Sequence, residues 1–177
     1  MVDGILCMNA SPESTPRPRA AVIGSGACGP EVAQLARELG ALLAEAGVDI
    51  VCGGLGGVME AVCQGAKMAG GATIGILPVE DRNRANPYVD VAVATPLSHM
   101  RNYLVVLNGD AVIAVEGGAG TLSELALAWK SGKVVVALGR LTQLKDLTEL
   151  GPIKPARTPR EAVDLFLDAL PGLPRQG

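Results

Sequence analysis

Residues 116–124, Glu-Gly-Gly-Ala-Gly-Thr-Leu-Ser-Glu, form the stretch that decides the fold of this chain. An uninterrupted apolar run, residues 111–115, precedes it, and a helical pattern follows it as far as Lys130. This order predicts a strand, a glycine turn and the start of a helix. Glycines let the backbone approach a ligand closely, and the first amides of a helix lack acceptors within the helix. The arrangement therefore favours binding of an anion such as a phosphate.

The same succession of strand, glycine turn and helix occurs twice before this stretch. Apolar residues 20–23 lead into the glycine-rich residues 24–29, and Pro30 then suits the first position of a helix. Residues 49–52 lead into a second glycine turn, residues 53–57, and a second helix. The pattern predicts further strands at residues 73–77, 88–94 and 133–138.

Strands that alternate with helices of this length predict an α/β fold, a Rossmann-like doubly wound parallel sheet with helices on both faces. In such sheets ligands bind beyond the carboxyl ends of the strands, at the point where the strand order reverses. The loops after Ile23, Ala94 and Val115 meet this description, so we expect the ligand site among them.

We expect a single domain, residues 20–172, between a flexible N-terminal tail, residues 1–19, and a short C-terminal tail, residues 173–177. The N-terminal tail lacks the basic start and apolar segment of a signal peptide. Residues 79–87 are polar and irregular, which indicates a mobile surface loop near a site. Residues 139–155 combine spaced leucines with a short strand near Ile153.

Composition excludes several classes of function. A formal net charge of -3 and a single Trp, two Tyr and one Phe argue against a nucleic-acid partner, which needs a basic face and stacking aromatics. No apolar run has the roughly 18 residues of a membrane span. The cysteines form no C-x-x-C pair and His99 is the only histidine, so we expect no metal site. Reduced, mostly buried thiols then indicate a cytoplasmic protein. The cysteines are Cys7, Cys28, Cys52 and Cys63.

Several motifs allow two interpretations. Residues 24–29 match the dinucleotide pattern G-x-G-x-x-G, but no acid ends the second strand, so a plain phosphate loop is favoured over NAD binding. Thr121 and Glu124 have the T-x-x-E spacing of a capping box, which spacing alone favours over a ligand role, although both roles can coexist. Arg101 is either a solvated surface group or a ligand-binding group at the switch point.

A set of these motifs between residues 20 and 138 resembles the LOG (Lonely Guy) family, whose fold is Rossmann-like and which is commonly dimeric. The matching elements are Gly24-Ser25, Gly53-Gly54-x-x-Gly57-x-Met59, Gly75-Ile76-Leu77-Pro78, Arg101 and Gly117-Gly118-Ala119-Gly120-Thr121-x-x-Glu124. The resemblance implies a homo-oligomer, dimer or higher, and hydrolysis of the N-glycosidic bond of nucleoside 5′-monophosphates without a cofactor.

The resemblance also implies roles for individual residues. Arg101 and Glu124 are the expected catalytic pair, with Glu124 ionised beside the cationic ribose and Arg101 holding it ionised. The residues expected to bind the phosphorylated ligand are Gly24, Ser25, Gly53, Gly54, Gly117, Gly118, Gly120 and Thr121.

Two departures from the family pattern leave a second interpretation open. The family's enzymes typically have Met-His-x-Arg-Lys and Pro-Gly-Gly, whereas this chain has Asn102 after the arginine and Glu116 before the glycines. Arg101-Asn102 and the short glycine turn, residues 53–57, resemble the branch that includes molybdenum cofactor carrier proteins. The sequence therefore predicts a phosphoribohydrolase or, alternatively, a non-catalytic carrier or sensor, with a nucleoside monophosphate or a phosphorylated pterin such as the molybdenum cofactor as its ligand.

Overall fold

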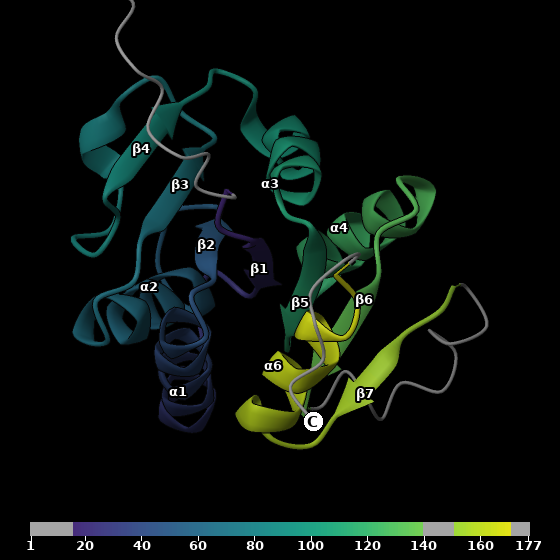
Figure 1. The fold of residues 1–177 in the computed structure, drawn as a ribbon. Coiled ribbons are helices and arrows are strands. Elements are labelled where there is room, and N and C mark those ends of the chain that lie inside the picture. Colours follow the sequence, from purple (N-terminus) through teal and green to yellow (C-terminus); the bar gives the residue numbers. More distant parts are fainter. Residues whose placement is uncertain (1–15, 140–150, 171–177) are drawn as a thin grey trace, which may run out of the picture.

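The computed structural model describes residues 16–139 and 151–170. Residues 1–15 of the predicted N-terminal tail (residues 1–19) and the whole predicted C-terminal tail (residues 173–177) lie outside the described residues, as do Cys7 and the leucines within residues 140–150. The described residues form one sheet with helices on both faces (Figure 1).

The sheet has seven parallel strands in the order β4-β3-β2-β1-β5-β6-β7. The strands are β1 (Arg19–Gly24), β2 (Asp49–Cys52), β3 (Thr73–Leu77), β4 (Val91–Ala94), β5 (Ala111–Val115), β6 (Val135–Leu138) and β7 (Lys154–Ala156). The chain proceeds from β1 to β4 on one side and from β5 to β7 on the other, so the strand order reverses between β1 and β5. The predicted doubly wound parallel sheet is confirmed.

The helices divide between the two faces of the sheet. They are α1 (Pro30–Glu45), α2 (Val58–Met68), α3 (Asn102–Asn108), α4 (Ala119–Lys130) and α6 (Pro159–Leu167), with short 3-10 helices η1 (Arg82–Arg84) and η2 (Ser98–Arg101). Helices α1, α2 and α6 cover one face, and α3 and α4 cover the other (Figure 1). Successive residues of a strand point to opposite faces, so Val22 joins the first core and Ile23 the second.

Three local predictions differ from the structure. The strand predicted from residue 88 begins at Val91, because Asp90 turns its carboxylate back to accept from the backbone amide and hydroxyl of Thr73. The strand predicted from residue 133 begins at Val135. The helical spacing of Leu104 and Leu107 predicts that both face the core. Leu107 is instead 47% exposed, because the buried stripe of α3 runs through Val105 and Val106.

Residues 79–87, predicted as a mobile surface loop, include the turn η1 and a buried anchor. Asn86 is 9% exposed; its backbone amide donates to the Gly54 carbonyl and its side chain to the Leu55 carbonyl, both at 2.9 Å. The segment thereby holds the glycine turn that follows β2.

The described cysteines are free thiols, with Cys52 and Cys63 buried and Cys28 half-buried. Among residues 16–139 and 151–170, no helix combines the length and apolar content needed to cross a membrane.

Candidate functional site

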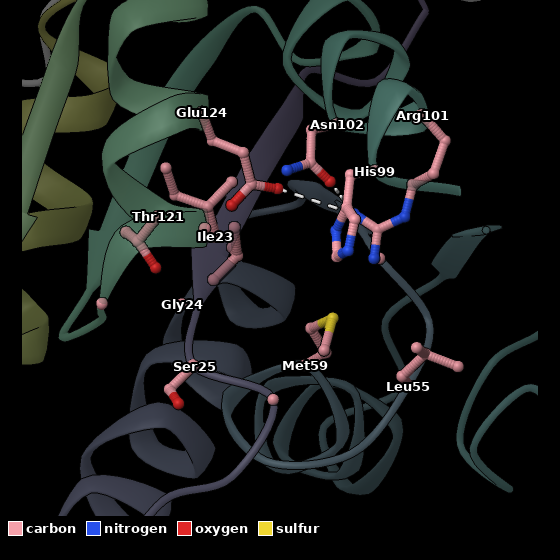
Figure 2. A pocket seen from close by; sticks show the side chains of 15 residues that line it. Ile23, Gly24, Ser25, Leu55, Met59, His99, Arg101, Asn102, Thr121 and Glu124 are labelled. Carbon is pink, nitrogen blue, oxygen red and sulfur yellow. Dashed lines mark hydrogen bonds and ion pairs between the residues drawn. The ribbon is translucent and has the colours of Figure 1, made fainter. Parts of the chain in front are cut away.

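A cavity of about 320 Å³ opens at the carboxyl ends of β1 and β5, where the strand order reverses (Figure 2). It is lined by Val22, Ile23, Gly24, Ser25, Gly26, Gly53, Leu55, Met59, His99, Arg101, Asn102, Gly118, Gly120, Thr121 and Glu124. The lining brings together segments that follow four different strands, β1, β2, β4 and β5, as expected of a switch point in such a sheet.

The structure thus gathers most of the residues that the sequence indicated. Gly24, Ser25, Gly53, Arg101, Gly118, Gly120, Thr121 and Glu124 all line the cavity. Gly54 and Gly117 do not line the cavity themselves, but each is next in sequence to a glycine that does. Gly54, with φ of +71°, packs against Leu77 and Gly75 of β3, and Gly117 leaves room for the Thr121 side chain, which a Cβ would strike.

Arg101 and Glu124 are buried together on one wall of the cavity, each 7% exposed. Arg101 ends η2 and Glu124 lies within α4, so they come from the two helical elements on the same face of the sheet. Their nearest charged atoms, Arg101 Nη1 and Glu124 Oε1, are 3.6 Å apart. This separation is longer than a strong charge-assisted hydrogen bond of about 2.7–2.9 Å, so the two groups attract each other without full pairing.

Two further contacts hold the Arg101 guanidinium. Nη1 donates to Asn102 Oδ1 at 2.7 Å. The guanidinium also lies over Gly53, where an added Cβ would come within 2.7 Å of Arg101 Cζ and 2.6 Å of Met59 Sδ. Arg101 Nε is buried and has no hydrogen-bond partner among the described residues. A buried cationic donor left unpaired is costly, so this atom suits an acceptor on a ligand.

Burial dominates the protonation of the pair. It raises the pKa of Glu124 from 4.5 to about 7, although the positive charge of Arg101 lowers it. The same burial lowers the pKa of Arg101, and Glu124 opposes that shift. The charge of Arg101 acts in the direction that the sequence predicted, but across 3.6 Å it does not offset the loss of water around the carboxylate. Near neutral pH the carboxyl exists in both forms.

The capping box that the spacing of Thr121 and Glu124 favours does not form, so this prediction is wrong. Helix α4 begins at Ala119 with Gly118 as its N-cap, and no side chain caps it. The glycines allow the helix to start early, which places Thr121 and Glu124 inside it and facing the cavity. The same spacing does form a cap at α6, where Thr158 Oγ1 accepts from the Glu161 amide at 3.2 Å and Glu161 Oε2 accepts from the Arg157 amide at 2.8 Å.

Two glycine loops form the polar end of the cavity. The loop after β1 presents Gly24, Ser25 and Gly26, and the start of α4 presents Gly118 and Gly120. An added Cβ on Gly24 would meet the Val115 carbonyl oxygen at 2.5 Å, so glycine lets the ends of β1 and β5, from which the two loops start, lie this close. The first amides of α4 and the helix dipole favour a negatively charged ligand group here.

Glu116, whose charge was expected beside the phosphate loop, does not line the cavity. Its side chain lies near the backbone of Gly139, at the end of β6. Its φ of +40° is a left-handed conformation that the fixed ring of a proline excludes, so the loop cannot have this shape in a chain with Pro-Gly-Gly.

Sequence reasoning did not assign Leu55, Met59, His99 or Asn102 to the ligand site, yet all four line the cavity. Only the positions of His99 and Asn102 beside Arg101 signalled their role. Within the described ranges there is no group of three or more His, Cys, Asp or Glu residues suited to a metal ion.

A model of the SLOG cluster4 family matches residues 17–163. The chain belongs to this family. The assignment confirms the predicted LOG-like family. This SLOG cluster4 protein is 42% identical over 148 residues to an uncharacterized protein of Archaeoglobus fulgidus, a match that covers 84% of this chain and 93% of that one. It is 38% identical over 106 residues to the cytokinin riboside 5′-monophosphate phosphoribohydrolase of Mycobacterium tuberculosis, covering 58% of this chain and 56% of that enzyme.

Solved structures similar to this SLOG cluster4 protein include molybdenum cofactor proteins. The molybdenum cofactor binding protein of Rippkaea orientalis has a TM-score of 0.83 and 38% identity, over 88% of this chain and 98% of that one. The molybdenum cofactor carrier protein of Chlamydomonas reinhardtii has a TM-score of 0.80 and 33% identity, over 87% of this chain and 98% of that one.

Proposed function

We propose that this SLOG cluster4 protein is a nucleoside 5′-monophosphate phosphoribohydrolase, which releases a free base and ribose 5-phosphate. The observation that carries the proposal is the buried pair of Arg101 and Glu124 on the wall of a cavity with a phosphate-type loop at one end. The similarity to the phosphoribohydrolase of Mycobacterium tuberculosis supports it.

The cavity offers a separate place for each part of such a substrate. The 5′-phosphate accepts hydrogen bonds from the loop after β1, from the first amides of α4 and from Thr121. The ribose then lies against Glu124. Cleavage of the N-glycosidic bond gives the ribose oxocarbenium character, which an ionised Glu124 stabilises across a short, poorly hydrated distance. Arg101, through its unpaired Nε, holds a substrate oxygen and opposes protonation of Glu124.

In a site that only binds an anion, the carboxyl of Glu124 would have no function. A buried carboxyl with a pKa of about 7 repels a phosphorylated ligand whenever it is ionised, and it costs stability to bury. A carboxylate facing a cation that develops during bond cleavage accounts for its presence. This difference favours hydrolysis over simple carriage.

The decisive experiment incubates the purified protein with a panel of nucleoside 5′-monophosphates and measures ribose 5-phosphate. We expect release from at least one member, reduced by about 100-fold or more in Glu124→Gln because the ionised carboxylate is lost. Glu38→Gln, an exposed residue on α1, is the matched control and should retain full activity. No release from any member, or equal release by Glu124→Gln, would overturn the proposal.

A molybdenum cofactor carrier is the second candidate, and Asn102 favours it. Asn102 replaces the positive charge that the enzymes typically have after the arginine, and the two molybdenum cofactor proteins resemble this chain over nearly their whole length. The residues that hold the cofactor's phosphate in this reading are those of the same two glycine loops. A carrier should bind a phosphorylated pterin equally well as wild type and as Glu124→Gln; failure of both to bind molybdopterin at micromolar concentration counts against it.

We also propose that the protein acts in the cytoplasm as a homo-oligomer, dimer or higher. Exposed apolar side chains on η2 and α3 support association: Met100 is 78% exposed, Tyr103 45% and Leu107 47%. Such side chains gather at interfaces between subunits. Light scattering coupled to gel filtration gives the oligomeric state, and a monomer at all concentrations would contradict this proposal.

A further inference from the structure

His99 is the only histidine of the chain, and it belongs to the cavity wall. It follows Ser98, whose φ of +50° is left-handed, a conformation that costs a non-glycine residue about 1–2 kcal/mol. The Ser98 amide donates to the Pro78 carbonyl at 3.1 Å, which ties this turn to the end of β3. The fold therefore holds His99 at the cavity in spite of local strain.

The position of His99 matches one end of a bound nucleotide. Figure 2 shows His99 and Arg101, which both come from η2, on the other side of the cavity from Ser25 and Thr121. If the phosphate lies at the glycine loops and the ribose at Glu124, the base lies toward His99 and the apolar side chain of Leu55. This placement rests on the function proposed above.

Hydrolysis of the N-glycosidic bond requires a proton at that end. A purine leaves with the electron pair of the bond, and protonation of a ring nitrogen makes it a far better leaving group. Proton donation by a positioned side chain contributes about 10²–10⁴-fold to such reactions. The site therefore needs a donor that can exchange protons near neutral pH.

Among the described residues that line the cavity, the side chains that ionise are His99, Arg101 and Glu124. A guanidinium does not release its proton under these conditions. Glu124 lies where the ribose cation develops and acts in its ionised form. Histidine is the side chain best suited to give and regain a proton near neutral pH.

We infer that His99 is a catalytic residue, the acid that protonates the departing base of a purine nucleoside monophosphate. In this step the C1′–N bond breaks and its electron pair stays with the base, whose ring nitrogen takes the proton of the His99 imidazolium. A water oxygen forms the new bond to C1′, and the water proton passes to ionised Glu124. Solvent then reprotonates His99 and removes the proton from Glu124, so the net reaction consumes one water molecule.

The test compares His99→Gln and Glu124→Gln on purine nucleoside monophosphates that carry amino, oxo or chloro groups at C6, which makes the leaving base progressively more acidic. We expect His99→Gln to lose at least about 100-fold in kcat for the 6-amino substrate and markedly less for the 6-chloro substrate. Glu124→Gln should lose a similar factor on all three, because it acts on the ribose. Circular dichroism and thermal unfolding check that both variants fold.

Each outcome bears on a different conclusion. An equal loss by His99→Gln on all three substrates indicates a role in binding or structure and overturns the inference, as does no loss. If wild-type protein hydrolyses none of the substrates, the proposed function fails and the role of His99 fails with it. If His99→Gln fails to fold, His99→Asn gives the same comparison with a shorter polar side chain.

Discussion

The buried carboxyl of Glu124 should make the stability of this protein depend on pH in a direction opposite to most carboxylates. Its pKa in the folded protein is about 7, against 4.5 for an exposed glutamate. Between these values the folded protein binds a proton that the unfolded chain releases. The stabilising contribution is therefore complete below about pH 4.5 and is lost as the pH rises through 7.

The magnitude follows from the size of the shift. A difference of roughly 2.5 pKa units, at about 1.4 kcal/mol per unit, corresponds to ~3 kcal/mol, most of it lost between pH 5 and pH 8. This is a large part of the ~5–15 kcal/mol that stabilises a typical domain. Glu124→Gln keeps the size of the side chain and removes the titration, so its stability should lack this dependence.

The assay is urea unfolding of wild type and Glu124→Gln at several pH values from 5 to 8. The difference between the two free energies of unfolding cancels the groups they share. We expect this difference to shift in favour of the Gln variant by about 2–3 kcal/mol as the pH rises, because only wild type must then bury a charge. Parallel curves, or a shift of opposite sign, would refute the reasoning that burial outweighs the attraction of Arg101.

Three further substitutions test other parts of the site. Gly53→Ala should reduce activity by about 100-fold and the free energy of unfolding by about 1–3 kcal/mol, because the new Cβ displaces the buried guanidinium above it. Gly56→Ala is the control, since its new Cβ meets only ordinary contacts. Equal effects of the two variants in activity and urea-unfolding assays would contradict this. Thr158→Val should lower the free energy of unfolding by about 1 kcal/mol, because the cap at α6 is lost. Thr121 does not cap α4, so Thr121→Val should instead weaken phosphate binding measured by calorimetry. Asn102→Ala removes the acceptor of the buried Arg101 Nη1, so kcat should fall and the free energy of unfolding should drop by about 1–3 kcal/mol. A loss of stability with unchanged kcat would show a purely structural role.

Much of the fold was predictable because local sequence determines local hydrogen bonding. The apolar run before residue 116 and the glycines after it indicated a strand, a turn and a helix, and the structure has β5 and α4 there. The boundaries failed where a side chain from another segment intervened, as with Asp90 and Thr73 before β4. Such contacts join segments that are distant in sequence, and no local pattern records them.

In the site, too, local spacing was visible in the sequence, whereas its structural outcome was not. Thr121 with Glu124 and Thr158 with Glu161 have the same T-x-x-E spacing, yet only the second pair forms a cap. The glycines before α4 let that helix begin earlier, which turns the first pair toward the cavity. The sequence contained both patterns, but the point at which each helix starts depends on the loops packed around it.

By itself the sequence determined the alternation of strands and helices, the switch point and the glycine loops, because these follow from periodicity and backbone freedom along the chain. Only the tertiary structure decided which side chains share the cavity and how Glu124 is protonated. A pKa depends on the water excluded by surrounding segments and on the 3.6 Å to Arg101, and both exist only once η2 and α4 have packed on the same face of the sheet.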